Sequence, residues 1–173
     1  SIAKTALKYG INKKTLTKYL KEKGIEIIAN RGAYSIDESV FEIIDSEEKA
    51  YWLGFLYADG YVAANSNQIG LGLMLSDIKH LEKYKNFMKW DGEIRVYKEH
   101  QFGGKDNYNK KGEEMYNCKV TITNEKIHRD LVNLGCVPNK SLILQFPSEN
   151  QVPKEFQASF VRGYFDGDGT LGL

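Results

Sequence analysis

The sequence has few of the residues that would tie it to a membrane, a zinc ion or an oxidising compartment. Its 173 residues include only two cysteines and three histidines. Cys118 and Cys136 lie far apart without a CxxC pair, and no histidine has metal-ligand spacing with them. No apolar run approaches the roughly 20 residues that span a bilayer, and the lysine-rich start lacks the apolar region of a signal peptide. We therefore expect a cytoplasmic protein with reduced cysteines and no membrane contact.

Charge is distributed unevenly along the chain, although the net charge is only +1. Residues 1–34 hold seven lysines and one arginine against two glutamates, a balance of +6. Residues 35–50 hold six acids against one lysine, a balance of −5, and the remaining residues are neutral. A short basic head on a balanced body is typical of nucleic-acid binding confined to one module. The alternative is a basic helix face that is merely solvated.

The basic head has the spacing of a helix-turn-helix. Ala6 is placed where two helices would cross, Gly10 follows at the turn, and Leu16 and Leu20 give a second helix its buried stripe. The outer face of that helix would bind the major groove of double-stranded DNA. It carries Lys13, Lys14, Thr17, Lys18 and Lys21. We expect this helical module over residues 1–30 and an acidic connector over residues 31–46.

The segment DSEEKAYWLGFLYADG predicts an unusual helix. Asp45 or Ser46 can cap its start, and the residues that follow are apolar on nearly every side, which predicts burial. Gly54 and Ala58 stand four residues apart and form a strip against which a second helix can pack. Asp59 follows at the negative end of the helix dipole, which disfavours an acid unless a cation sits there.

The closing segment FVRGYFDGDGTLG repeats this pattern 109 residues further on (163 − 54). The residues that correspond to Gly54, Ala58, Asp59 and Gly60 are Gly163, Gly167, Asp168 and Gly169. Pairing the two helices would bring Asp59 and Asp168 together. Two close carboxylates repel unless they share protons or divalent metals, and oxygen ligands of this kind suit Mg²⁺. The repeat therefore favours a magnesium site that acts on a phosphodiester.

The motifs WLGFLYADG and VRGYFDGDG resemble the two LAGLIDADG motifs of the homing endonucleases, in the single-chain form with two motifs. The stretch LGCVPNKSLILQFP between them extends the resemblance, which covers roughly residues 47–173. It implies an α+β fold in which helices back a saddle of antiparallel strands laid along the DNA. Residues 47–159 would form the first half-domain, and residues 160–173 would form the second motif helix.

The resemblance also implies a function, the site-specific cutting of double-stranded DNA with Mg²⁺ or another divalent cation. The host cell would carry a bacterial, phage or other mobile element. Asp59 and Asp168 would hold the metal, the backbone carbonyls of Ala58 and Gly167 would face it, and Lys140 would be a basic catalytic residue. Only four residues follow Gly169, so we expect a missing C-terminal half or a second copy of the chain to complete the saddle.

The chain between the motifs is consistent with such a half-domain. NQIGLGLMLS alternates as a strand that buries one face from Ile69 to Leu75 and turns Gln68 toward DNA. SDIKHLEKYKNFM predicts an amphipathic helix capped by Ser76 or Asp77. EIRVYKEH and EMYNCKVTIT predict two more strands, and NEKIHRDLVNLG predicts a second helix. We place the polar loop between these strands on DNA phosphates through Lys105, Lys110 and Lys111.

Two other functions fit part of this pattern. FDGDGTL also resembles the first motif of the haloacid dehalogenase-like phosphatases, with Asp166 as nucleophile and Asp168 as acid/base, at the end of a strand. The stronger alternative is a protein of the LAGLIDADG fold that binds DNA without cutting it, such as a transcription regulator or an intron maturase. Because both metal-site acids are present, we favour the enzyme.

Overall fold

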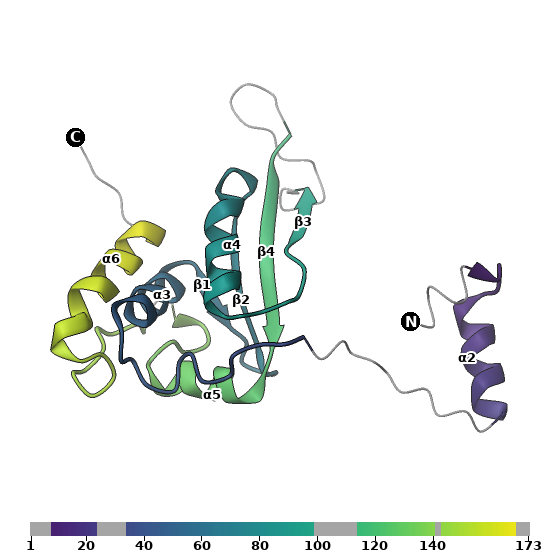
Figure 1. The fold of residues 1–173 in the computed structure, drawn as a ribbon, viewed down its shortest axis with the longest axis horizontal. Helices are drawn as coiled ribbons and strands as arrows, with labels where there is room; N and C mark the ends of the chain where they lie inside the picture. Colours follow the sequence, from purple (N-terminus) through teal and green to yellow (C-terminus); the bar gives the residue numbers. More distant parts are fainter. Residues whose placement is uncertain (1–7, 24–33, 99–113, 141–142, 169–173) are drawn as a thin grey trace. The chain divides into compact units, whose positions relative to one another are not determined.

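The computed structural model describes residues 8–23, 34–98, 114–140 and 143–168 (Figure 1). The chain divides into two compact units, Ser1–Tyr34 and Ser35–Leu173, and each is described by itself. No helix within the described ranges is both long and apolar enough to cross a membrane.

The first unit contains helix α2, Lys13–Glu22. Asn12 precedes it, and its side-chain oxygen accepts a hydrogen bond from the backbone N–H of Lys14 at 2.8 Å, as a capping residue does. Gly10 has a φ of +63°, which a glycine adopts without strain. A helix therefore lies where the second helix of the helix-turn-helix was expected, after a glycine turn. Ala6 lies outside the described residues.

The second unit contains a four-stranded antiparallel sheet in the order β1-β2-β4-β3. Its strands are β1 (Gly60–Val62), β2 (Gln68–Met74), β3 (Arg95–Lys98) and β4 (Tyr116–Thr123). The expected α+β class with an antiparallel sheet is confirmed. Strand β2 ends one residue early, because Leu75 begins a short 3₁₀ turn, η1 (Leu75–Asp77), that runs directly into the next helix.

Alternation of side chains gives the sheet one buried face and one open face. Ile69 and Leu71 of β2 are 1% and 0% exposed, and their partners Ile122 and Val120 on β4 are buried with them. The intervening pairs lie on the other face, which no described helix covers. We call this the open face; its residues include Tyr61, Gln68, Gly70, Gly72, Met74, Arg95, Tyr97, Asn117, Lys119 and Thr121.

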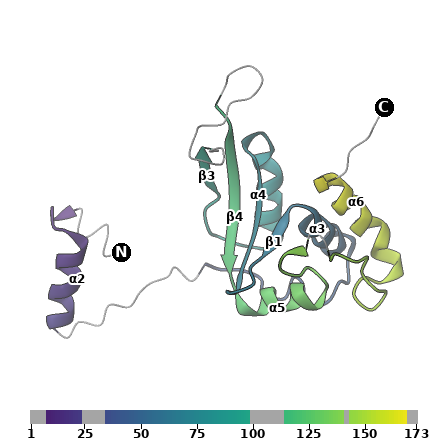
Figure 2. The ribbon, with the colours of Figure 1, turned by 180° about the vertical axis from the view of Figure 1, so that it is seen from behind.

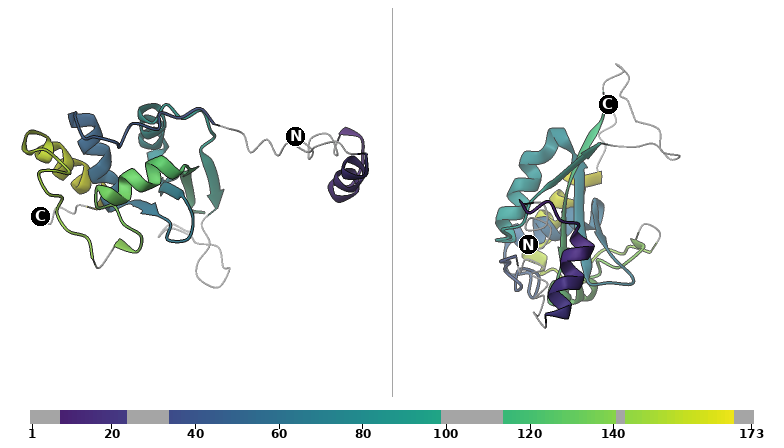
Figure 3. Two further views of the ribbon diagram at one scale, coloured as in Figure 1. Left: turned by 90° about the horizontal axis from the view of Figure 1, so that it is seen from below. Right: turned by 90° about the vertical axis from the view of Figure 1, so that its right-hand side faces the viewer.

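Helices α4 (Ile78–Phe87) and α5 (Glu125–Asn133) pack on the buried face (Figures 2 and 3). Each contributes a fully buried leucine, Leu81 from α4 and Leu131 from α5. Asn124 caps α5 by accepting a hydrogen bond from the N–H of Ile127 at 2.9 Å. Asp77 occupies the equivalent place before α4 without such a bond, and the N–H of Ile78 donates to the carbonyl of Leu75 in η1.

Helices α3 (Glu47–Ala58) and α6 (Gln157–Asp168) lie side by side at one end of the second unit (Figure 1). Ser46 caps α3, since its side chain accepts a hydrogen bond from the N–H of Lys49 at 3.3 Å. A 3₁₀ turn, η3 (Lys154–Phe156), leads into α6. As expected for a helix that is apolar on most sides, α3 is buried on nearly all of its circumference from Trp52 to Tyr57.

Residues 35–46 differ from the acidic connector expected of residues 31–46. Val40, Phe41 and Ile44 are 4%, 0% and 2% exposed and belong to the core of the second unit. The acids around them face outward and pair with lysines of that unit, as Glu42 does with Lys126 at 2.8 Å. Burial of three large apolar side chains outweighs the charge of the segment, so the unit begins at residue 35.

Candidate functional site

The site is built on a seam where the backbones of α3 and α6 touch. A Cβ added to Gly54 would lie 2.0 Å from the carbonyl oxygen of Phe160, and one added to Gly163 would lie 1.9 Å from that of Tyr51. The two contacts are equivalent, because Phe160 follows Tyr51 by the same 109 residues (160 − 51) as Gly163 follows Gly54. Only glycine permits this approach, so the two helices cross at these residues.

The close approach continues to the C-terminal ends of both helices. A Cβ on Gly167 would lie 2.5 Å from the Cβ of Ala58 and 3.4 Å from a carboxylate oxygen of Asp59. All four residues that the sequence assigned to helix packing therefore lie at the seam, and the two acids follow where it ends. We call Asp59 and Asp168 the acid pair.

Asp59 is the C-cap residue directly after α3, and its N–H donates to the carbonyl of Phe55 at 3.0 Å. Desolvation raises the pKa of its carboxyl group above the ordinary value, and the charge of Asp168 raises it further. The charge of Lys140 acts in the opposite direction. Asp168 is exposed at the end of α6. The structure thus places Asp168 close enough for its charge to disfavour ionisation of Asp59.

Lys140 is bound to the end of α3. Its ammonium donates to the carbonyl oxygens of Tyr57 and Ala58, each at 2.6 Å. A cation beside the negative end of the helix dipole is favourable. Lys140 therefore provides a positive charge at the helix end where the acid Asp59 would otherwise be disfavoured. The carbonyl of Ala58, which was expected to face a metal, accepts a hydrogen bond from Lys140 with one of its two lone pairs. Lys140 is held there directly after Asn139, which has a left-handed φ of +55°.

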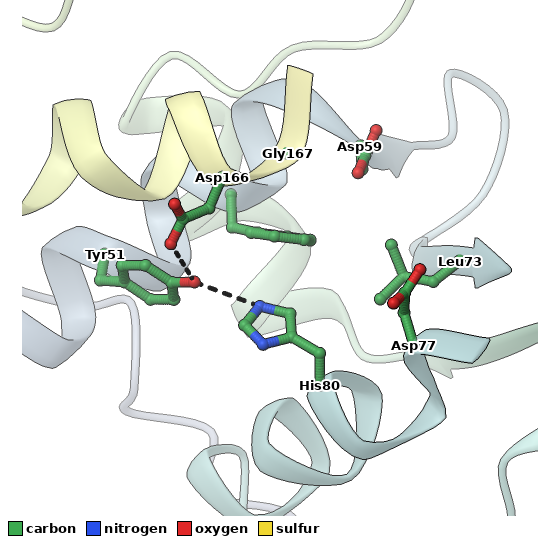
Figure 4. A pocket seen from close by; sticks show the side chains of 8 residues that line it. Tyr51, Asp59, Leu73, Asp77, His80, Asp166 and Gly167 are labelled. Atoms are coloured by element: carbon green, nitrogen blue, oxygen red, sulfur yellow. Dashed lines mark hydrogen bonds between the residues drawn. The ribbon is translucent and has the colours of Figure 1, made fainter. Parts of the chain in front are cut away.

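Two neighbouring pockets meet at Asp59, Leu73 and Asp77. The first, of about 370 Å³, lies between α3, α4 and α6 and is also lined by Tyr51, Phe55, His80, Asp166 and Gly167 (Figure 4). The second, of about 400 Å³, lies over the open face beside Gly72, Met74, Tyr97 and Asn117. Asp59 therefore lies where the first pocket joins the open face of the sheet.

Sequence reasoning missed a polar cluster in the first pocket. The hydroxyl of Tyr51 donates to Asp166 at 2.9 Å and lies 3.2 Å from Nε2 of His80. No motif signals it, because the three residues lie 29 and 115 positions apart. Asp166 lies inside helix α6 and not at the end of a strand. The phosphatase alternative, which needs that aspartate at a strand end, is therefore wrong.

The opposite side of the helix pair is apolar. Tyr57 and Phe160 occupy the places equivalent to Asp166 and Tyr51, and their rings meet edge to face at 5.0 Å. The ring of Phe146 lies 5.6 Å from that of Phe160, and a pocket of about 420 Å³ opens beside them. Phe146 and Val161, which line this pocket, are 61% and 49% exposed, so this side presents apolar surface to solvent.

The expected DNA contacts are distributed over both units. Gln68 lies on the open face, where its side-chain oxygen accepts a hydrogen bond from Tyr61 at 3.1 Å. Lys14 and Lys18 of α2 are exposed, Thr17 is half-buried, and Lys13 and Lys21 lie in the same helix. Lys105, Lys110 and Lys111 fall outside the described residues. Sequence reasoning missed Arg95, Tyr97 and Lys119, which strand alternation assigns to the open face; the Lys119 ammonium lies 5.2 Å from the Tyr97 ring centroid.

The acid pair fits Mg²⁺ better than zinc. Within the described ranges no group of three or more histidine, cysteine, aspartate or glutamate residues could hold a metal ion. Mg²⁺ is commonly bound by one or two carboxylates and keeps several waters, whereas zinc needs a fuller set of protein ligands. The desolvated carboxylate of Asp59, which lies beside a second carboxylate, is stabilised by a divalent cation.

A scan against protein-family models finds no match to this chain, and a search of the curated proteins finds none either. The geometry of the seam, the acid pair and the open face is therefore the ground on which the function is inferred.

Proposed function

We propose that this protein is a DNA endonuclease of the LAGLIDADG type, with residues 47–168 forming one half-domain and the second motif helix. The observation that carries the proposal is the glycine seam, which brings one acid from each of two repeated helices together at the edge of an open sheet face. Helix α3 supplies Asp59 and helix α6 supplies Asp168. A nuclease needs this combination, because the same surface must hold the duplex and position the phosphodiester to be cut.

The open face supports the binding part of the proposal. It carries hydrogen-bonding side chains such as Asn117, and cations such as Arg95 and Lys119, with an exposed tyrosine between them. Strand side chains can reach base edges in the major groove, while lysine and arginine contact phosphates. We assign recognition of the duplex to this face and additional phosphate contacts to α2.

The acid pair supports the catalytic part. Asp59 and Asp168 would hold a divalent cation, which when bound would activate water and stabilise the leaving oxygen of a phosphodiester. Lys140 places a positive charge beside Asp59 and offsets the negative end of α3, so a phosphate can approach carboxylates that would otherwise repel it. The seam fixes both acids on helices and leaves little freedom in their spacing.

The test is cleavage by the Asp59→Asn variant. A randomised duplex DNA library is incubated with the protein and Mg²⁺, and the retained molecules and fresh ends are sequenced. We expect wild-type protein, supplied with its remaining half or acting as two copies, to produce staggered ends at an enriched site. Asp59→Asn should abolish cutting and leave DNA affinity within a few-fold, because a carboxylate is lost and the sheet is untouched.

The matched control is Asp91→Asn, the same change at an exposed aspartate away from the seam. It should cut as wild type does. Loss of DNA binding together with cutting in Asp59→Asn would make Asp59 a structural residue, and the proposed catalytic role would then fail.

A DNA-binding protein that does not cut is the second candidate, and Lys140 is the observation that favours it. Its ammonium already neutralises the end of α3, so the acid beside it needs no metal for stability. This function, as a transcription regulator or an intron maturase, predicts an enriched site without fresh ends. Binding should then be unchanged when Mg²⁺ is replaced by a chelator.

The basic head gives a separate prediction about affinity. Deleting residues 1–30 should weaken DNA binding and flatten its salt dependence, because each lost phosphate contact reduces the slope of log K against log salt by about 0.9. Binding is measured at several salt concentrations for the full chain and the deletion. An unchanged slope would instead assign the head to protein contacts.

A further inference from the structure

Three polar side chains from three helices form a continuous hydrogen-bond chain beside the seam (Figure 4). The Tyr51 hydroxyl of α3 donates to Oδ2 of Asp166 in α6, and it lies 3.2 Å from Nε2 of His80 in α4. A tyrosine hydroxyl has one proton, and here that proton goes to Asp166. Nε2 of His80 must therefore carry the proton of the second hydrogen bond. The chain runs from His80 through Tyr51 to Asp166 and joins all three helices.

Aromatic packing holds the members of this chain in place. The His80 ring lies between Trp52 and Phe55, at centroid distances of 4.9 Å and 4.7 Å. The guanidinium of Arg162 lies 5.1 Å from the centroid of the Tyr51 ring. Rings confined in this way lose little further freedom when they form hydrogen bonds, so the bonds contribute more of their energy to holding the helices.

The hydrogen-bond chain joins α3 and α6 at positions away from the point where the two helices cross. Tyr51 lies three residues before Gly54 on α3, and Asp166 lies three residues after Gly163 on α6. The small-residue contacts fix where the helices cross and how closely their C-terminal ends approach, and a hydrogen bond beside them adds a restraint on the tilt and rotation of α6. A tie from one side of the crossing on α3 to the other side on α6 restrains both motions. Asp168 follows Asp166 by half a turn of the same helix.

The repeat shows that this tie is not a by-product of helix packing. The residues equivalent to Tyr51 and Asp166 are Phe160 and Tyr57, which meet only through their rings. The hydroxyl of Tyr57 donates to the carbonyl of Leu134 and does not reach α6. The seam therefore packs on its second side without any polar tie between the helices, and the first side has one in addition.

We propose that His80, Tyr51 and Asp166 are positioning residues, whose hydrogen-bond chain holds the last turn of α6 and sets the placement of Asp168 relative to Asp59. The consequence for cutting rests on the function proposed above, whereas the positioning itself does not.

The test compares amide hydrogen exchange in the last turn of α6, residues 164–168, with exchange in strand β4, which neither the Tyr51 nor the Tyr57 hydroxyl contacts. Tyr51→Phe keeps the ring and removes the hydroxyl, so both hydrogen bonds are lost. We expect the ratio of exchange rates between the two segments to rise about ten-fold, as for the loss of a hydrogen bond to a charged group. Asp166→Leu should give the same rise, and Asp166→Asn, which keeps an acceptor oxygen, should stay near wild type.

Tyr57→Phe is the matched control, because it removes a hydroxyl from the same helix that has no bond to α6. It should slow or speed exchange in both segments together and leave their ratio unchanged. The proposal is overturned if Tyr51→Phe leaves the ratio unchanged, if Asp166→Asn behaves as Asp166→Leu does, or if the last turn of α6 is already unprotected in the wild type.

Cleavage measurements separate this proposal from the proposed function. If the wild type cuts DNA, Tyr51→Phe should lower the single-turnover rate about ten-fold and leave DNA affinity unchanged, since the sheet is not altered. If the wild type cuts DNA and Tyr51→Phe cuts it at the same single-turnover rate, the hydrogen-bond chain has no effect on catalysis. If the wild type cuts nothing while the exchange ratio rises as expected, the nuclease function fails and the positioning of α6 stands.

Discussion

The two sides of the α3/α6 pair share one backbone geometry and differ in their side chains. On one side, His80, Tyr51 and Asp166 form a hydrogen-bonded chain in a pocket that reaches Asp59. On the other, Tyr57 and Phe160 make an apolar contact next to exposed apolar surface. The close approach of the two helices therefore depends on the small residues of the seam, while the side chains beside the seam carry different chemistry on each side.

The same contrast separates the ends of the two helices. Lys140 clamps the last two carbonyls of α3, and the described part of the chain has no second lysine bound in this way at the end of α6. Asp59 therefore lies on a helix end that is fixed from outside the pair. Asp168 depends on the seam and on the tie through Asp166 for its place.

The largest expected effect on stability comes from substituting the glycines of the seam. Gly54→Ala and Gly163→Ala should each lower the free energy of unfolding by about 3 kcal/mol, because each new methyl group meets a carbonyl oxygen of the partner helix at 2.0 Å or less. Urea denaturation of the two variants measures whether the costs are equal, as the repeat requires.

Gly72→Ala is the control for these variants, since its Cβ would meet no atom closer than 3.8 Å. It should change stability by less than about 0.5 kcal/mol. A seam variant as mild as this control would show that the helices separate easily, contrary to the packing described.

A smaller effect should follow from removing the clamp on α3. Lys140→Met keeps much of the side-chain length and removes the ammonium, which leaves the carbonyls of Tyr57 and Ala58 without their donor. We expect a loss of about 2 kcal/mol in urea denaturation. The pKa of Asp59, measured from its carboxyl ¹³C shift, should rise further, because the charge of Lys140 now lowers it.

Lys154→Met changes an exposed lysine on η3 and serves as the matched control. Neither stability nor the Asp59 titration should respond to it. A stable Lys140→Met variant with an unchanged Asp59 would mean that the clamp does not form in solution.

The smallest effect should be the pH dependence of the acid pair. The pKa of Asp59 is raised on folding, so its ionisation destabilises the protein, and this cost develops as pH rises from the ordinary aspartate value of 3.8 through the folded pKa. In a buffer with chelator, Asp59→Asn should therefore be more stable than wild type at pH 7, and the difference should vanish near pH 3. Thermal denaturation across this range measures it.

Asp37→Asn should behave in the opposite way. Hydrogen bonds from Lys89 and Ser39 hold the pKa of Asp37 well below its ordinary value. Its ionised form stabilises the fold above pH 4, and this contribution is lost as pH falls. The variant should be less stable than wild type at pH 7, so two aspartate-to-asparagine changes should have opposite signs; equal signs would contradict the assigned electrostatics.

Much of the fold could be predicted from local patterns. Period-two alternation gave the buried and open faces of β2, and a capping serine with an apolar run gave α3. Small residues at matching positions of a repeat gave the seam. The strand and the helix depend on residues close together in the sequence, and the seam depends on a repeat 109 residues apart (163 − 54). Each leaves a regular spacing that can be read without a structure.

The remaining features depend on contacts between residues far apart in the sequence and on the directions in which long side chains point. The acidic charge of residues 35–46 concealed Phe41, whose burial is visible only when the core is assembled. Lys140 was expected near the acids, but the carbonyls it binds could not be predicted because a long side chain can point in many directions. The tie between His80 and Asp166 has no sequence signal, since a tertiary contact created it.

The two faces of the sheet place stability and surface chemistry on different sets of residues. Ile69, Leu71, Val120 and Ile122 maintain the core, whereas Met74, Arg95, Tyr97, Asn117 and Lys119 on the open face contribute little to it. A combinatorial library at the second set could therefore vary the surface chemistry of the sheet against an almost constant thermodynamic background. Retargeting such a scaffold would be limited by the reach of its strands and hardly at all by its folding.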